Sequence, residues 1–251
     1  MQYSAEMNAT ENKVTLSNLL GVDDNHVVDV DDELAWGGAV RLHPAVLTPL
    51  RALHRLAAMQ GFDLRVASGY RGLVRQRAIW NAKASGQRPV FDELERPVDI
   101  STIPPARRLQ LLLCWSAIPG LSRHHWGTDL DIIDAAAIPA DFELQLTVAE
   151  TRDDGPFERF HAWLDEQLRA GDALGFDRPY DGRRCAVAAE PWHLSYRPLA
   201  DAFQAQLVVA DVKTALVGYD ISLWDDIAAA LPDLLDRYVR VRWSQVDSVR
   251  H

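Results

Sequence analysis

The sequence predicts an α+β fold, and three observations lead to that prediction. The chain has 251 residues, of which 48% are hydrophobic and 25% charged, proportions typical of a globular protein with a sizeable core. Segments with apolar residues at helical spacing are mixed with short alternating segments typical of strands. These segments do not follow the regular strand–helix–strand alternation of a doubly wound parallel sheet, which favours the α+β class.

The first half of the chain predicts two helices separated by one strand. Residues 1–35 are polar and acidic and are expected to form an N-terminal arm. After Pro44, which suits the first turn of a helix, apolar residues recur at spacings of three and four. These residues are Val46, Leu50, Leu53 and Ala57. Gly61 ends that helix, residues 63–67 alternate as a strand, and a second helix is expected over residues 73–84.

The second half mixes further helices, strands and loops. Residues 85–102 contain glycine and proline and are interpreted as a loop near the site. The elements expected beyond it are helices at 102–118, 157–168 and 222–238, and strands at 128–133, 185–189 and 239–243. Ser222 and Asp225 suggest a capping box for the last helix. The main domain is expected to span residues 36–200, with a mostly helical extension over 201–251 packed on it.

Charge and composition limit the possible functions. The formal charge of −10 and the pI near 5.2 argue against nucleic-acid binding, because phosphate contacts need clustered Lys and Arg. The two cysteines, Cys114 and Cys185, do not form a disulfide framework. The sequence shows neither a run of ~20 apolar residues that could span a membrane nor a secretion signal. The expected location is therefore the cytoplasm, or the periplasm or cell wall if the true start lies elsewhere, and no oligomeric state is indicated.

Two histidines and an aspartate form the candidate metal site. His124 precedes the predicted strand that carries Asp131, and Gly127 allows the backbone to turn between them. With His193, these side chains can fill three of the four tetrahedral positions of zinc and leave the fourth for water, as in catalytic zinc sites. Glu190 lies three residues before His193 and can exchange a proton with that water.

The residue types suit metal-assisted hydrolysis. Zinc lowers the pKa of bound water to about 7, and Glu190, which is not itself a ligand, can carry the proton to the leaving amine. The anion formed on the attacked carbonyl needs a donor or a positive charge. Arg71, at the end of a predicted strand, is the best candidate for that role. Its planar guanidinium can also pair with a substrate carboxylate, and a surface turn residue is the structural alternative.

Three motifs in this order resemble the VanY-type D-alanyl-D-alanine carboxypeptidases. They are Ser68-Gly-Tyr-Arg71 with Gln76 five positions on, Ser122-x-His124-x-x-Gly127-x-x-x-Asp131, and Glu190-x-Trp192-His193. The resemblance covers residues 40–200 and extends more distantly to lysostaphin-type endopeptidases and the hedgehog signalling domain. It implies a small antiparallel sheet flanked by helices, with the metal in a cleft across the sheet.

The resemblance also implies roles for individual residues. The implied zinc ligands are His124, Asp131 and His193. The implied general base is Glu190. The residues implied to contact the substrate's terminal carboxylate or the developing oxyanion are Arg71, Gln76 and Ser122. Tyr70 and Trp192 complete the candidate substrate contacts, Trp192 as an apolar wall.

Asp129 departs from the family pattern, since many relatives have alanine there. On a strand it would share a face with Asp131. It could orient a ligand histidine or pair with Arg123. His125, as the neighbour of a ligand, is expected to point away from the metal.

The favoured function is a zinc carboxypeptidase that removes the C-terminal D-alanine from a peptidoglycan stem peptide. The same residues could instead serve L,D-carboxypeptidase or endopeptidase chemistry on muropeptides. A carboxylate clamp favours exopeptidase action, whereas an open groove favours endopeptidase action, and a cytoplasmic location raises the L,D option. A non-catalytic zinc module that binds peptide or wall fragments is the alternative of another class. The presence of both Glu190 and Arg71 favours the enzyme.

Overall fold

A computed structural model describes residues 14–243 of the chain. Its centre is a four-stranded antiparallel sheet with the strand order β3-β6-β8-β7. The strands are β3 (Leu64–Ser68), β6 (Asp129–Asp134), β7 (Phe176–Asp177) and β8 (His193–Tyr196). Two short antiparallel pairs lie outside this sheet: β1 (Val28–Asp29) with β2 (Arg41–Leu42), and β4 (Val90–Phe91) with β5 (Pro97–Val98). The α+β prediction is confirmed.

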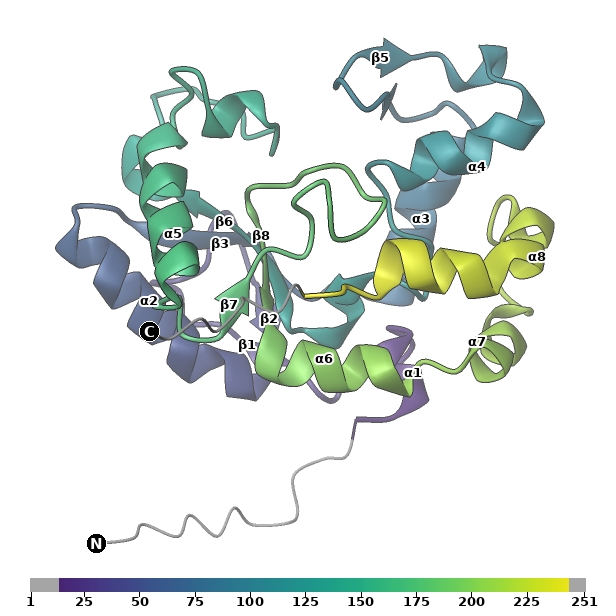
Figure 1. Ribbon diagram of the computed structural model, residues 1–251, viewed down its shortest axis with the longest axis horizontal. Coiled ribbons are helices and arrows are strands. Elements are labelled where there is room, and N and C mark those ends of the chain that lie inside the picture. The colour runs from purple at the N-terminus through teal and green to yellow at the C-terminus, as the bar shows by residue number, and fades with distance from the viewer. Residues whose placement is uncertain (1–13, 244–251) are drawn as a thin grey trace, which may run out of the picture.

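Helices flank this sheet on two sides (Figure 1). On one side lie α2 (Pro44–Met59) and α5 (Glu158–Ala170). On the other lie α3 (Leu73–Ala84), α4 (Pro105–Leu113), α7 (Val209–Leu216) and α8 (Trp224–Leu234), the last continued by a π-helix over Leu235–Val239. The remaining α-helices are α1 (Leu16–Leu19) and α6 (Arg197–Gln206). None of the helices described is long and apolar enough to cross a membrane.

The two faces of the sheet have different chemistry because strand side chains alternate. Leu130 and Ile132 of β6 and Leu194 of β8 pack with α2 and α5 in one buried core. The intervening residues of β6, Asp129 and Asp131, point to the opposite face. One face therefore supplies hydrophobic stabilisation, and the other presents buried polar groups.

A second core forms among the helices on the other side of the sheet. It joins Leu73 and Trp80 of α3 to Leu216 of α7 and Leu231 of α8, all buried. α6 runs from Arg197 to Gln206, so the expected domain boundary at residue 200 falls inside a helix. The C-terminal helices consequently share their core with the helix that follows the Ser-Gly-Tyr-Arg motif.

Several expectations for individual segments are corrected by the structure. The end of the expected N-terminal arm, residues 14–35, packs on the domain, with Leu19 and Leu20 buried. The expected loop over residues 85–102 contains the β4–β5 hairpin. The helix expected over 102–118 spans only Pro105–Leu113.

Two predicted strands and a predicted cap are also wrong. Residues 185–189 form no strand, because their backbone N–H groups donate to distant carbonyls, Ala186 to Arg237 and Ala188 to Cys114. Residues 239–243 form no strand either, and the N–H of Val241 donates to the side chain of Gln204. Ser222 forms no capping box: α8 starts after Leu223, which has a left-handed backbone and no side-chain cap.

Candidate metal centre

Two antiparallel strands bring two of the three predicted ligands face to face. Asp131 of β6 is paired directly with His193, the first residue of β8. Directly opposed residues of antiparallel strands have neighbouring side chains on the same face. His193 therefore comes from the start of a strand, and Glu190 from the irregular segment ahead of it.

His124 reaches the same point from a tight turn. It lies in a 3-10 turn, Arg123–Trp126, that ends at Gly127 with φ of +67°. A side chain on Gly127 would collide with Val27 and the backbone of His43, so only glycine fits there. The turn directs the chain into β6 and leaves His124 beside the strand. The predicted role of Gly127 thus has a physical basis in packing as well as in backbone conformation.

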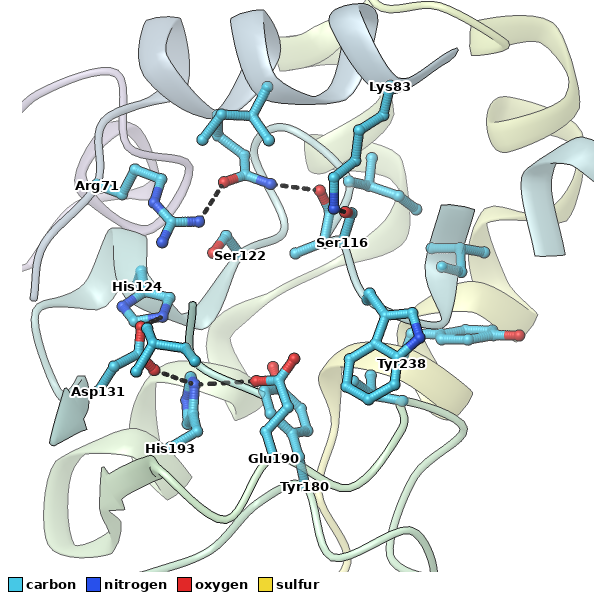
Figure 2. A pocket seen from close by; sticks show the side chains of 18 of the residues that line it. Arg71, Lys83, Ser116, Ser122, His124, Asp131, Tyr180, Glu190, His193 and Tyr238 are labelled. Carbon is cyan, nitrogen blue, oxygen red and sulfur yellow. Dashed lines mark hydrogen bonds and ion pairs between the residues drawn. The ribbon is translucent and has the colours of Figure 1, made fainter. Parts of the chain in front are cut away.

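The three predicted ligand side chains converge within metal-binding distance. One ligand atom from each of His124, Asp131 and His193 lies within 4.8 Å of the others, and all three side chains are buried. The Nε2 atom of His124 is 3.4 Å from Asp131 Oδ2, and Nδ1 of His193 is 3.2 Å from Asp131 Oδ1. Figure 2 shows these three residues together at one side of a pocket.

The hydrogen bonds of the two rings show which nitrogens face the metal position. Nδ1 of His124 donates to the carbonyl of Gly69 at 2.8 Å, which leaves Nε2 as the ligand atom. Nε2 of His193 lies 3.0 Å from Asp129 Oδ1, which leaves Nδ1. Buried His193 Nδ1 and Asp131 Oδ1 have no hydrogen-bond partner among residues 14–243. These two buried atoms without hydrogen-bond partners lie close to the free Nε2 of His124. Together the three atoms are suitable donors for a bound cation.

The charge state of His124 suits metal binding, whereas the carboxylates of Asp129, Asp131 and Glu190 outweigh burial and raise the pKa of His193, which must lose its proton to bind a metal. Burial lowers the pKa of His124 to about 4, so the ring is neutral at neutral pH, as a ligand must be. Nitrogen and oxygen donors in a set of three with an open position are typical of catalytic zinc.

Asp129 occupies a fully buried polar network behind His193. Its Oδ1 accepts from Arg123 Nε at 2.8 Å and its Oδ2 from the hydroxyl of Thr128 at 2.7 Å and of Ser195 at 3.1 Å. Burial alone would raise its pKa, but Arg123 and His193 hold the pKa of this carboxyl well below its usual range. Asp129 thus makes the contacts of both predicted alternatives at once: it bonds to the predicted ligand His193 and pairs with Arg123.

Glu190 lies beside the ligands with its carboxylate in the cavity. Its Oε2 is 3.5 Å from Nδ1 of His193, the atom that faces the metal position. The backbone fixes it on both sides, because its N–H donates to Tyr180 and its carbonyl accepts from the N–H of His193. Burial raises the pKa of Glu190, an effect that His193 partly offsets. A carboxylate in this place can take up and release a proton next to a metal-activated water.

Arg71 and Gln76 form a rigid donor pair on the other side of the ligands. Arg71 Nη1 donates to Gln76 Oε1 at 3.0 Å, and Gln76 Nε2 donates to the carbonyl of Ala117 at 2.7 Å. Arg71 Nη2 donates to Ser68 at 3.3 Å, and its Nε is buried without a partner. No aspartate or glutamate among residues 14–243 forms an ion pair with Arg71. Its charge is therefore available to an anionic group in the cavity.

Of the other predicted site residues, two line the cavity and one does not. Ser122 and Trp192 line the cavity, as expected. Tyr70 does not: its ring packs against His26, and its hydroxyl donates to the carbonyl of Gly21 at 3.4 Å. Tyr70 therefore lies outside the cavity that Arg71 lines. The expectation of substrate contact at Tyr70 is corrected.

His125 points away from the ligands and supports Arg71 from behind. Its Nδ1 donates to the carbonyl of Arg71, and its Nε2 accepts from the N–H of Gly120 at 3.0 Å. Burial lowers the pKa of His125 to about 3, which keeps the ring neutral and able to accept that bond. His125 is thus a positioning residue for the backbone at Arg71.

The cavity has a volume of about 320 Å³ and extends well beyond the ligands. The polar and aromatic residues that line it without having been predicted as site residues include Lys83, Ser116, Tyr180 and Tyr238. The ring of Tyr180 lies against His193 at a centroid distance of 4.6 Å. Lys83 follows Gln76 by seven positions in a predicted helix, a spacing that indicates a shared face and could have identified it.

Two distant segments meet over the cavity. Glu95, from the β4–β5 hairpin, accepts a hydrogen bond from the N–H of Val148 at 2.9 Å. Glu95 and the residues just before Val148, Gln145–Thr147, all line the cavity. The hairpin and this loop are thereby joined by a contact at the cavity rim.

Comparisons with known proteins show the family to which the chain belongs. The VanY family, described as D-alanyl-D-alanine carboxypeptidase, matches residues 39–199. The chain belongs to the VanY family. The predicted recognition is thus confirmed, and membership in a VanY carboxypeptidase family supports a peptidase.

Individual relatives add the following similarities. An uncharacterized protein of Haemophilus influenzae is 34% identical over 49% of this VanY-family chain and 92% of its own length. The solved structure of VanYB in complex with D-alanine-D-alanine has 21% identity and a TM-score of 0.46, covering 77% of this chain and 91% of that one. The LdcB LD-carboxypeptidase structure has 19% identity and a TM-score of 0.48, covering 76% and 78%.

Proposed function

We propose that this VanY-family chain is a zinc-dependent D,D-carboxypeptidase that releases the C-terminal D-alanine of peptidoglycan stem peptides. One observation carries the proposal: the His124, Asp131 and His193 ligand atoms, the Glu190 carboxylate and the unpaired Arg71 guanidinium all face one cavity. Family membership supplies the class of bond, and the convergence of these groups supports hydrolysis rather than binding alone.

Each group has a part in hydrolysis. The chemistry supplied by a bound zinc ion is Lewis acidity, which makes a water acidic at neutral pH and polarises the scissile carbonyl. Glu190 accepts the proton of the attacking water and later donates it to the leaving amine. Arg71, held in place by Gln76 and Ser68, stabilises an anionic oxygen of the substrate.

Two features support exopeptidase action over endopeptidase action. Arg71, Gln76 and Ser122 line one side of the cavity and can hold a terminal carboxylate. The contact between Glu95 and Val148 joins two segments that line the cavity, whereas an endopeptidase needs a groove open at both ends. Removal of a terminal residue requires neither opening of this contact nor a long groove.

A panel of defined peptides tests the proposal. Zinc-loaded protein is incubated with stem tri-, tetra- and pentapeptides, and the released fragments are identified by mass. A D,D-carboxypeptidase releases one alanine from the pentapeptide and leaves the tetrapeptide intact. Alanine release from the tetrapeptide would replace the proposal with L,D-carboxypeptidase action. No release from any peptide, with stoichiometric zinc bound, would favour a non-catalytic binding module.

A further inference from the structure

Lys83 is a positively charged residue that lines the cavity, and the proposed hydrolytic mechanism gives it no role. It lies on α3, seven residues after Gln76, so the two share a helix face and lie ~10 Å apart along the axis. Its ammonium donates to the hydroxyl of Ser116 at 2.6 Å. Lys83 and Ser116 lie together across the pocket from Arg71 and the ligands (Figure 2).

The ammonium of Lys83 lacks an acidic partner. No aspartate or glutamate within residues 14–243 forms an ion pair with it, and its one hydrogen-bond partner, Ser116, is neutral and buried. A lysine ammonium has three donors, so two remain for a group in the cavity. Burial lowers the pKa of Lys83, against the opposing influence of the Glu190 charge.

A packing role alone does not account for this geometry. Lysines that cover apolar surface usually extend their ammonium groups into water. Here the half-buried side chain directs its head group into the cavity that holds the candidate metal site, where its partner is a neutral hydroxyl and not an opposite charge. An anionic ligand would supply the missing partner and add a charge-assisted hydrogen bond.

We propose that Lys83, together with the hydroxyl of Ser116, binds a second carboxylate of the substrate, distinct from the group held by Arg71. The inference rests on the proposed function, since it assigns the substrate of the same site. From a terminal carboxylate held near Gln76, two residue steps of extended peptide at ~3.3 Å each reach ~6.6 Å, and a long side chain on the next residue covers the rest of the ~10 Å along α3. The second carboxylate is therefore assigned to the side chain of the third residue from the C-terminus, as in a pentapeptide with diaminopimelate at that position.

A matched pair of peptides tests this assignment. Both are L-Ala-γ-D-Glu-diaminopimelate-D-Ala-D-Ala, one with a free diaminopimelate side-chain carboxylate and one with a carboxamide in its place. The variant is Lys83→Met, which keeps the side-chain length and removes the charge. Lys213→Met is the control, because Lys213 is exposed on α7, outside the cavity. Lys83→Arg tests rescue by a second cation.

The Lys83→Met variant is expected to lose activity selectively on the peptide with the free carboxylate. Lys83→Met lowers kcat/KM for the free acid by about tenfold or more, mainly through KM, and changes that for the carboxamide less than twofold. Lys83→Arg retains most of the preference, and Lys213→Met leaves it unchanged. Equal losses on both peptides would overturn the inference, because a structural role or an effect on Glu190 predicts no discrimination. An unchanged kcat/KM would overturn it as well.

Binding measurements separate this inference from the proposed function. Calorimetry with zinc-loaded protein gives the affinity for each peptide even if neither is cleaved. Absence of hydrolysis, with free-acid binding that is tighter and depends on Lys83, would reject the proposed activity and retain the second carboxylate site. Hydrolysis without any free-acid preference in the wild type would retain the activity and reject the site.

Discussion

At the scale of single residues, the site depends on how two imidazole rings are oriented. His124 presents Nε2 because its Nδ1 is bound to the carbonyl of Gly69, and His193 presents Nδ1 because its Nε2 is bound to Asp129. Asp129 is itself fixed by Arg123, Thr128 and Ser195. Hydrogen bonds to the second nitrogen of a ligand histidine fix its orientation and raise its basicity. Asp129 thus acts on a predicted metal ligand, His193.

Asp129→Asn is expected to weaken zinc binding by about 10–100-fold, because the amide is a poorer and uncharged acceptor for His193. Competition with a chromophoric chelator measures the change in affinity. Asp134→Asn is the matched control, because Asp134 is a buried aspartate of the same strand that bonds to Asp63 and Ala136, away from the ligands. Wild-type zinc affinity in the folded Asp129→Asn variant would contradict the role given to Asp129.

At the scale of elements, a segment outside the family match supports the site. Gly21, with φ of +72°, packs so closely on His125 that a Cβ atom would overlap the ring. The carbonyl of Gly21 accepts a hydrogen bond from Leu73, the first residue of α3, and His125 holds the carbonyl of Arg71. These contacts join the N-terminal segment around Gly21 to the turn that carries His124 and to the start of α3.

Gly21→Ala is expected to lower Tm by several degrees more than Gly37→Ala. Both glycines have nearly the same positive φ, +72° and +73°, so the backbone strain is matched, but a Cβ at Gly37 meets nothing within 4 Å. The overlap with His125 adds an overpacking cost of about 1–3 kcal/mol, and each kcal/mol lowers Tm by ~2–4 °C in a chain of this size. Thermal unfolding followed by circular dichroism measures both, and equal Tm values would rule out the close contact.

Local pattern was sufficient for some elements and for the ligands. The apolar face of α2 was predicted from spacing alone, because it is set by local periodicity. The helix expected over residues 73–84 has the bounds that the structure shows. The ligand set followed from residue type and the resemblance, and the structure brings it together. Residues 185–189 were predicted wrongly because alternation indicates a strand only if a neighbouring strand pairs with it. Their N–H groups instead donate to carbonyls near residues 114 and 237, contacts that no local pattern reveals.

At the scale of the whole molecule, the site lies where two cores meet. The sheet that carries Asp131 and His193 packs on α2 and α5, whereas Gln76 and Lys83 belong to α3, which packs with the C-terminal helices. Arg123 links the two parts, since its side chain bonds to Asp129 and to the carbonyl of Val239. The C-terminal segment beyond the family match also lines the cavity through Tyr238 and Val239. The arrangement of the site therefore depends on both hydrophobic cores.

Turnover by Glu190→Gln, measured with zinc bound, tests the central claim most directly. Glutamine keeps the size of the side chain but cannot take up a proton, and Glu190 is not among the three ligands. The variant is expected to bind one zinc ion per chain, as the wild type does, and to lose D-alanine release from the pentapeptide by at least about 100-fold. Wild-type turnover by the zinc-loaded Glu190→Gln variant would show that Glu190 is not the base and would contradict the proposed mechanism.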